Sequence, residues 1–222
     1  MTVPQPLARS FAAFLFDMDG TLLDSTAVAN RVWSTWAESH GLDAEQVIAA
    51  LHGVRVRDTV RRFATGTMDV DREAERITAG EIAQVDGITE IAQARAFLDS
   101  LPRDRWAVVT SAPRALAIRR IEAAGLPSPP LLIAAEDIMI GKPAPDCYIA
   151  AAKALGVEIR DCLIWEDAPA GIAAGEAAGS TVIVVEATHA DPVNAGRLCI
   201  PDFSGLSCTV EANGMLRLHG AS

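Results

Sequence analysis

The 222-residue chain has little positive charge, few cysteines and no long apolar run. Its formal net charge of −10 argues against nucleic acid or an anionic membrane as a partner, because both attract a basic surface. The four cysteines form neither a CxxC pair nor a zinc-site spacing, so we interpret them as reduced thiols. No stretch has membrane length, and the N-terminus lacks a signal pattern. We therefore expect a soluble, cytoplasmic protein.

Apolar runs of strand length alternate with helical stretches through the second half of the chain. Half of the residues are hydrophobic, which is ample for one large domain or for a core with a small insert. Strands separated by helices are typical of a parallel, doubly wound α/β sheet with right-handed crossovers. We predict strands at 106–110, 131–134, 162–165 and 181–185, and helices at 90–101, 115–124, 145–155 and 171–178.

The first predicted strand, Phe11–Phe16, is separated from the next one by about 90 positions. A crossover between parallel strands needs only a dozen or more residues. The span from Ser25 to Asp86 reads as helical, and we interpret it as a helical cap that acts as a lid. The predicted division is a core domain of residues 1–24 and 87–222 with a cap domain of residues 25–86. The last part of the chain is expected to add small edge strands.

Polar side chains follow four predicted strands at the points where they end. Ligands in such sheets bind at the carboxyl ends of the strands, so these side chains can converge. Each has an ordinary explanation when taken alone, such as an acidic turn, a helix cap or a surface lysine. Together, carboxylates suit Mg²⁺ and a lysine suits a phosphate, so the set indicates a metal and a phosphate at one sheet edge. The residues are Asp17, Asp19, Thr110, Ser111, Lys142, Glu166 and Asp167.

Four ordered motifs resemble those of the haloacid dehalogenase superfamily. They are Asp17-Met18-Asp19-Gly20-Thr21, Val108–Ser111, Gly141-Lys142-Pro143 and Trp165–Gly171. The resemblance covers roughly residues 12–190 and implies a Rossmann-like core with a cap inserted after the first motif. Segments 44–58 and 165–175 are similar to the sugar-phosphate and polyol-phosphate phosphatases of the superfamily, glycerol-phosphate and 2-deoxyglucose-phosphate phosphatases among them.

The resemblance implies Mg²⁺-dependent hydrolysis of small sugar or polyol phosphate monoesters. Asp17 would attack phosphorus and form an aspartyl-phosphate, and Asp19 would protonate the leaving alcohol and then activate water. The carboxylates of Asp17 and Asp167 and the main-chain carbonyl of Asp19 would hold Mg²⁺, with Glu166 as a further ligand, direct or through water. The phosphate-binding residues would be Thr110, Ser111 and Lys142.

Substrate choice would lie in the cap. The histidine and arginine beside Gly53, His52 and Arg55, are our candidates for substrate contact. An ordinary solvated helix face that pairs with acids explains the rest of the local basic cluster, Arg57, Arg61 and Arg62. We assign Trp33 and Trp36 to the core, and His40, His189 and His219 to the surface. A monomer is the default expectation.

Three alternatives to a phosphatase share parts of this pattern. The β-phosphoglucomutase relatives carry a cap histidine near the position of Ala29 and Asn30 here, which disfavours a mutase. A response-regulator receiver, a phospho-signalling and binding module, also places acids and a lysine at the edge of a doubly wound sheet, but receivers are short and lack a helical insert. A catalytically inactive homologue is not supported, because no motif residue is missing.

Overall fold

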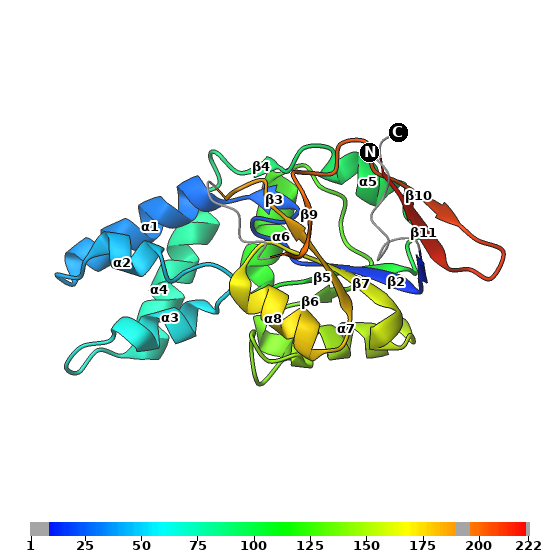
Figure 1. Cartoon of the computed structure of the whole chain (residues 1–222). Helices are drawn as coiled ribbons and strands as arrows, with labels where there is room; N and C mark the ends of the chain where they lie inside the picture. Colours follow the sequence, from blue (N-terminus) through cyan, green and yellow to red (C-terminus); the bar gives the residue numbers. More distant parts are fainter. Residues whose placement is uncertain (1–8, 190–195, 221–222) are drawn as a thin grey trace.

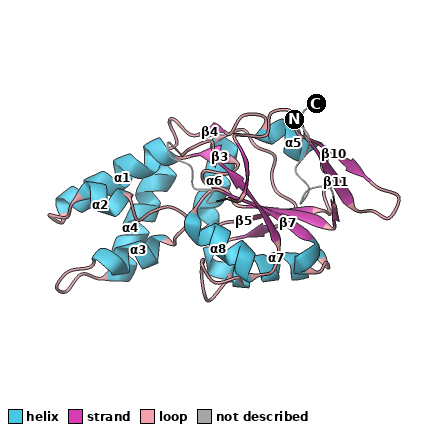
Figure 2. Cartoon of the chain, viewed as in Figure 1, coloured by secondary structure: helices cyan, strands magenta, loops and turns pink. Residues whose placement is uncertain are grey.

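The computed structural model describes residues 9–189 and 196–220. Its centre is a six-stranded parallel sheet in the order β6-β5-β2-β7-β8-β9, with helices on both faces (Figures 1 and 2). This arrangement confirms the predicted doubly wound α/β core. The strands are β2 (Ala13–Phe16), β5 (Trp106–Val109), β6 (Leu132–Ile133), β7 (Cys162–Glu166), β8 (Thr181–Val185) and β9 (Leu198–Ile200).

Successive residues of β2 point to opposite faces of the sheet, and each face carries its own apolar layer. Phe14 stacks on Phe97 of α5 on one face, whereas Leu15 packs in a cluster with Tyr148 of α7 on the other. Both faces are covered, which is why the strand reads as a continuous apolar run. One face holds α5 (Ala94–Asp99) and α6 (Arg114–Ala123), and the other holds α7 (Asp146–Leu155) and α8 (Pro169–Ala177).

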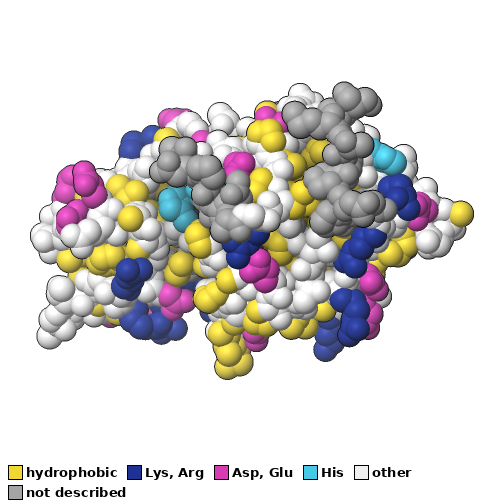
Figure 3. All heavy atoms as spheres, viewed as in Figure 1, with side chains coloured by type: hydrophobic (Ala, Val, Ile, Leu, Met, Phe, Trp, Pro, Cys, Tyr) yellow, Lys and Arg dark blue, Asp and Glu magenta, His cyan; other side chains and the backbone are white. Residues whose placement is uncertain are grey.

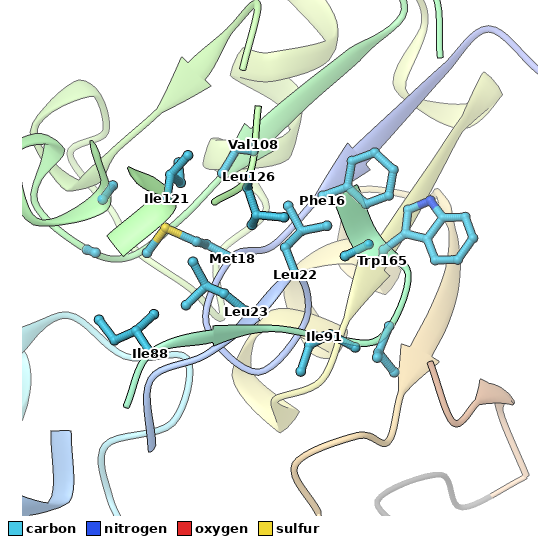
Figure 4. Packing of buried hydrophobic residues seen from close by; sticks show 14 of the residues in the cluster. Phe16, Met18, Leu22, Leu23, Ile88, Ile91, Val108, Ile121, Leu126 and Trp165 are labelled. Atoms are coloured by element: carbon cyan, nitrogen blue, oxygen red, sulfur yellow. The ribbon is translucent and has the colours of Figure 1, made fainter. Parts of the chain in front are cut away.

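The loop that follows β2 is anchored by its own apolar residues. Met18, Leu22 and Leu23 are at most 1% exposed and point into a hydrophobic cluster (Figure 4). The apolar side chains of the loop thus pack into the core beside the polar residues of the motif. Asp17 and Asp19 are thereby held at the sheet edge by packing as well as by the strand.

Four helices between β3 and β4 form a group beside the sheet (Figure 1). Strands β3 (Leu23–Asp24) and β4 (Thr89–Glu90) pair antiparallel, so the chain leaves and rejoins the core at one place. We call the group the helical insert; whether it is a separate domain with the predicted boundaries stays a prediction. Its helices are α1 (Thr26–Ser39), α2 (Ala44–Ile48), α3 (Val56–Phe63) and α4 (Val70–Ala83).

Two helices of the insert begin where aspartates cap them. The Asp43 carboxylate accepts hydrogen bonds from the main-chain N–H groups of the first turn of α2, and Asp69 does the same for α4. Such caps satisfy amides that have no partner inside the helix. The pairs α1–α2, α3–α4 and α1–α4 then pack against one another, and α4 also packs against α6 of the core. No helix in residues 9–189 and 196–220 is long and apolar enough to cross a membrane.

Two local predictions were wrong. The helix predicted at 90–101 is shorter, because Thr89 and Glu90 pair with β3 and α5 starts only at Ala94. The strand predicted at Phe11–Phe16 breaks at Ala12, because β1 (Ser10–Phe11) pairs with β11 in a separate antiparallel sheet, β1-β11-β10. The remaining elements are β10 (Ser207–Val210), β11 (Leu216–His219) and the 3₁₀ helices η2 (Ala135–Asp137) and η3 (Ile159–Asp161). Of the tail strands, β9 and β10 lie at sheet edges as expected, whereas β11 lies between β1 and β10.

Candidate active site

The carboxyl ends of β2, β5 and β7 lie side by side at one edge of the sheet. Phe16 pairs with Val108 on one side and with Trp165 on the other, so the residues that follow these strands meet. The loop after β6 returns Lys142 to the same edge. The structure thus brings together Asp17, Thr110, Ser111, Lys142, Glu166 and Asp167.

Lys142 is the buried cation of this edge. Its ammonium group donates to Asp17 Oδ1 (2.6 Å), to Glu166 Oε1 (2.6 Å) and to the Val109 carbonyl (3.2 Å), and its side chain is 1% exposed. Burial by itself lowers the pKa of Lys142, but the two carboxylates act against it and the net pKa lies well above the usual value. Burial raises the pKa of Asp17 well above its usual value, although Lys142 opposes that shift.

Glu166 is held from several directions. Tyr148 Oη donates to Oε1 (2.6 Å), and the main-chain N–H groups of Asp167 and Ala168 donate to Oε2 (3.1 and 3.3 Å). A Cβ at Gly171, in the first turn of α8, would lie 1.6 Å from Glu166 Oε1, so only glycine fits there. Glu166 therefore has a defined position, and in this structure it orients Lys142.

Asp167 is the third buried carboxylate. Thr21 Oγ1 donates to its Oδ1, and His189 Nε2 lies 3.3 Å from its Oδ2. Burial raises the pKa of Asp167, and the His189 contact partly offsets that rise. The assignment of His189 to the surface was wrong, because the chain after β8 returns over the site. Gly20 (φ +84°) approaches so closely that a Cβ there would lie 2.1 Å from Asp167 Oδ2.

The donor atoms fit a hard divalent cation. Asp17, Glu166 and Asp167 each offer a carboxylate oxygen, and these oxygens lie within 4.8 Å of one another. Three buried carboxylates face one ammonium group, and a cation would relieve their mutual repulsion. Oxygen donors of this kind suit Mg²⁺.

A pocket of about 90 Å³ opens above Asp17. Asp19, Thr110, Ser111 and His52 line it, and so does Trp33, which is also 3% exposed and part of the core. Lys142, Glu166 and Asp167 lie outside the described lining of the pocket, in the buried layer beside Asp17. The pocket thus brings Asp17, Asp19, Thr110 and Ser111 to one opening, and the Lys142 ammonium group lies buried beside Asp17. Glu81 and Arg120 line it as well.

A hydrogen bond connects the loop after β5 to the helical insert. Ser111 Oγ donates to the Gly53 carbonyl (3.0 Å), so the residue next to His52 is tied to the end of β5. Thr110 Oγ1 accepts from the Ala112 N–H (3.0 Å). Both hydroxyl groups are therefore oriented by the main chain.

Asp19 has partners that the sequence did not indicate to us. Its Oδ1 accepts from Ser25 Oγ (2.6 Å) and from Arg120 Nη1 (2.9 Å), and Arg120 Nη2 donates to Glu81 Oε1 (2.9 Å). The sequence pattern could have revealed Arg120 as a buried charge. It occupies a position on the apolar face of α6, beside Leu116, Ala117 and Ile121.

The structure places Arg55 away from the pocket, contrary to the role we expected. Its guanidinium donates to the carbonyls of Ile138 (2.6 Å) and Met139 (3.0 Å), and it is absent from the described lining of the pocket. Arg55 therefore ties the insert to the loop that carries Lys142. Basic side chains gather over α3 in Figure 3, and two of them form surface pairs, Arg57 with Asp71 and Arg61 with Asp58.

Comparison with known proteins identifies the family. The model of the haloacid dehalogenase-like hydrolases matches residues 11–179. The chain belongs to this family. It is thus an enzyme of the hydrolase class, as the resemblance implied.

Named relatives cover nearly the whole of this haloacid dehalogenase-like hydrolase. Hexitol phosphatase A of Escherichia coli (strain K12) is 40% identical over 90% of this chain and 95% of its own length. Glycerol-1-phosphate phosphohydrolase 2 of Saccharomyces cerevisiae is 35% identical over 83% of this chain and 78% of its own. The β-phosphoglucomutase of Clostridium difficile shares the fold, with a TM-score of 0.70 and 22% identity over 79% of this chain and 84% of that one.

Proposed function

We propose that this hydrolase is a Mg²⁺-dependent phosphatase that cleaves small sugar or polyol phosphate monoesters through an aspartyl-phosphate. The observation that carries the proposal is Asp17 at the pocket, bonded to buried Lys142 and two residues from a second, partly exposed acid, Asp19. The names of the two phosphatase relatives support the substrate class.

Asp17 and Asp19 would divide the reaction between them. The Asp17 carboxylate attacks phosphorus, the bond to the ester oxygen breaks, and Asp19 gives a proton to the departing alcohol. Water then attacks the phosphorus of the aspartyl-phosphate while Asp19 takes a proton from it, which releases inorganic phosphate and restores Asp17. Asp19 suits this work because it lines the pocket and is 29% exposed.

The neighbouring groups would stabilise the transferring phosphoryl group. Lys142 already neutralises part of the charge on Asp17 and would reduce its repulsion of the phosphate. Thr110 and Ser111 line the same pocket and would contact phosphoryl oxygens. Glu166 keeps Lys142 in place through its own bond to the ammonium group.

Asp17, Asp167 and Glu166 would hold Mg²⁺, with the Asp19 main-chain carbonyl as the further ligand that the family resemblance implies. When bound, the ion would offset negative charge on the phosphate and on Asp17. A mutase is less well supported: Ala29 and Asn30, near the expected cap histidine, both line the pocket, so neither position supplies that group. The monomeric state and cytoplasmic location stay predictions.

A panel of phosphorylated sugars, polyols and nucleotides, assayed for released phosphate with and without Mg²⁺, tests the proposal. We expect release from small sugar or polyol phosphates, and none after treatment with EDTA. Conversion of one sugar phosphate isomer to another without phosphate release would favour the mutase instead. A rate that is unchanged in EDTA would overturn the metal role.

A further inference from the structure

Arg120 carries a charge on the buried face of α6. It shares this face with apolar residues and is 6% exposed. A buried charge is costly unless it is paired and hydrogen-bonded. The partners of Arg120 therefore account for its presence in this place.

Two acids from different parts of the molecule pair with the guanidinium of Arg120. Nη1 donates to Asp19 in the loop after β2, and Nη2 donates to Glu81 in α4 of the helical insert, each over 2.9 Å. Glu81 is itself buried, with a side chain 3% exposed. The planar, forked guanidinium is suited to holding two carboxylates at once, whereas an ammonium group is a single point charge. Arg120 thus joins Asp19 to the insert.

The contacts of Asp19 fall on one of its two carboxylate oxygens. Ser25 Oγ and Arg120 Nη1 both donate to Oδ1. Within residues 9–189 and 196–220, no group forms a hydrogen bond with Oδ2. A carboxylate held through one oxygen has a defined orientation, and its other oxygen is free to exchange a proton.

We propose that Arg120 is a positioning residue for Asp19, and that its bond to Glu81 makes the orientation of Asp19 depend on the placement of α4. The inference rests on the proposed function, in which Asp19 protonates the leaving alcohol. Arg120 also lines the pocket, but its described hydrogen bonds go to Asp19 and Glu81, so it acts through Asp19 rather than on the reacting atoms. If α4 moves away from α6, Arg120 loses one of its two acids and orients Asp19 less well. The insert therefore controls the acid as well as covering the pocket.

Hydrolysis rates of two substrates with different leaving groups distinguish a role of Arg120 in positioning Asp19 from a role in folding. The alkoxide of glycerol phosphate needs a proton as it leaves, whereas 4-nitrophenolate does not. The ratio kcat/KM reports only the steps up to phosphorylation of Asp17. For Arg120→Met we expect kcat/KM to fall about 100-fold with glycerol phosphate and less than about threefold with 4-nitrophenyl phosphate, as for loss of a general acid. Asp19→Asn provides the reference pattern.

Matched variants test the geometry. Arg119→Met removes the same charge from an exposed position of the same helix and should change neither rate. Arg120→Lys keeps the charge without the fork, so its loss with glycerol phosphate should be intermediate. Glu81→Gln keeps an acceptor without the charge and should give a smaller loss with the same substrate dependence. These two variants also test the proposal if Arg120→Met unfolds below the temperature of the assay.

A second measurement concerns the phosphoenzyme. If Arg120→Met misplaces Asp19, water attack on the aspartyl-phosphate also slows, and mixing with 4-nitrophenyl phosphate should give a burst of nitrophenolate. Equal losses with both substrates in the Arg120 and Glu81 variants would overturn the proposal in favour of a structural role. Unchanged rates with glycerol phosphate would overturn it too. If Asp19→Asn itself shows no dependence on the leaving group, the acid role of Asp19 fails and the inference fails with it.

Discussion

The sheet edge and the outer surface of the helical insert hold their charged side chains in opposite ways. At the edge, the Lys142 and Glu166 side chains are at most 1% exposed, and each has several partners. On the insert, the Arg57–Asp71 and Arg61–Asp58 pairs are 42 to 63% exposed. Exposed pairs contribute about 0 to 1 kcal/mol, whereas breaking a buried pair costs several times more. The proposed chemistry thus lies where charge is buried, and the insert contributes to it through the residues that line the pocket, His52 and Glu81 among them.

The largest effect should come from the nucleophile at the sheet edge. Asp17→Asn should lower turnover by at least about a thousandfold, because no other group in the proposed mechanism forms the phosphoenzyme. The melting temperature should change little, because removal of one of three crowded carboxylates offsets the loss of the buried Asp17–Lys142 ion pair. Phosphate release and thermal melting check both points, with the exposed Asp146→Asn as the control. Activity above about one per cent of wild type would rule out the assignment.

Removal of the metal should have the next largest effect. EDTA should abolish phosphate release, and Mg²⁺ should restore it and raise the melting temperature by binding the folded chain. Asp167→Asn should lose most of that shift in melting temperature, because one of the three oxygen donors becomes a neutral amide. Calorimetric scans with and without Mg²⁺ measure this independently of activity. An equal rise in melting temperature with Mg²⁺ in wild type and in Asp167→Asn would mean that Asp167 does not bind the ion.

A smaller effect is expected where the insert reaches the pocket. His52→Ala should reduce kcat/KM for sugar and polyol phosphates about five- to tenfold, the scale of one lost hydrogen bond, and should change 4-nitrophenyl phosphate hydrolysis less. His40→Ala is the matched control, because His40 contacts Trp36 and Glu73 rather than the pocket. Equal losses on all substrates would mean that His52 does not select the substrate.

The smallest effect should come from the exposed surface of the insert. Arg57→Gln removes a charge from the Arg57–Asp71 pair and should change stability by less than about 0.5 kcal/mol. Its kcat/KM should match that of wild type on every substrate. Urea unfolding and the phosphate assay measure the two quantities. A marked loss of stability or of kcat/KM would contradict the conclusion that the exposed charges of the insert contribute little.

The strands and the motif residues could be predicted from the sequence because they follow local rules. A strand that is buried on both faces is apolar throughout, so β5, β7 and β8 were visible as runs ending in polar groups. The capped starts of α2 and α4 likewise depend on neighbouring residues. The β3–β4 pair was missed because each strand has only two residues, and the pairing joins positions that are far apart along the chain.

For the site, too, local motifs could be predicted and contacts between distant segments could not. Asp17, Lys142 and Asp167 stand out because they belong to motifs at strand ends. Arg120 and Tyr148 lie on helices and gain their roles only from packing, which brings α6 beside Asp19 and α7 beside Glu166. The sequence did not predict that Arg55 contacts the carbonyls of Ile138 and Met139, because neighbouring glycine and basic residues do not reveal which carbonyls a long side chain will reach.

The sequence alone determined the class of sheet, the order of the motifs, the presence of the helical insert and the acids at the strand ends. Those features depend on periodicity, strand length and local turn chemistry, which any short window of the chain displays. Only the tertiary structure decided the partners of each acid: Lys142 with Asp17 and Glu166, His189 with Asp167, and Arg120 with Asp19 and Glu81. The reason is physical, because a buried charge takes its partner from whichever segment the fold brings within hydrogen-bond distance, however distant in the chain.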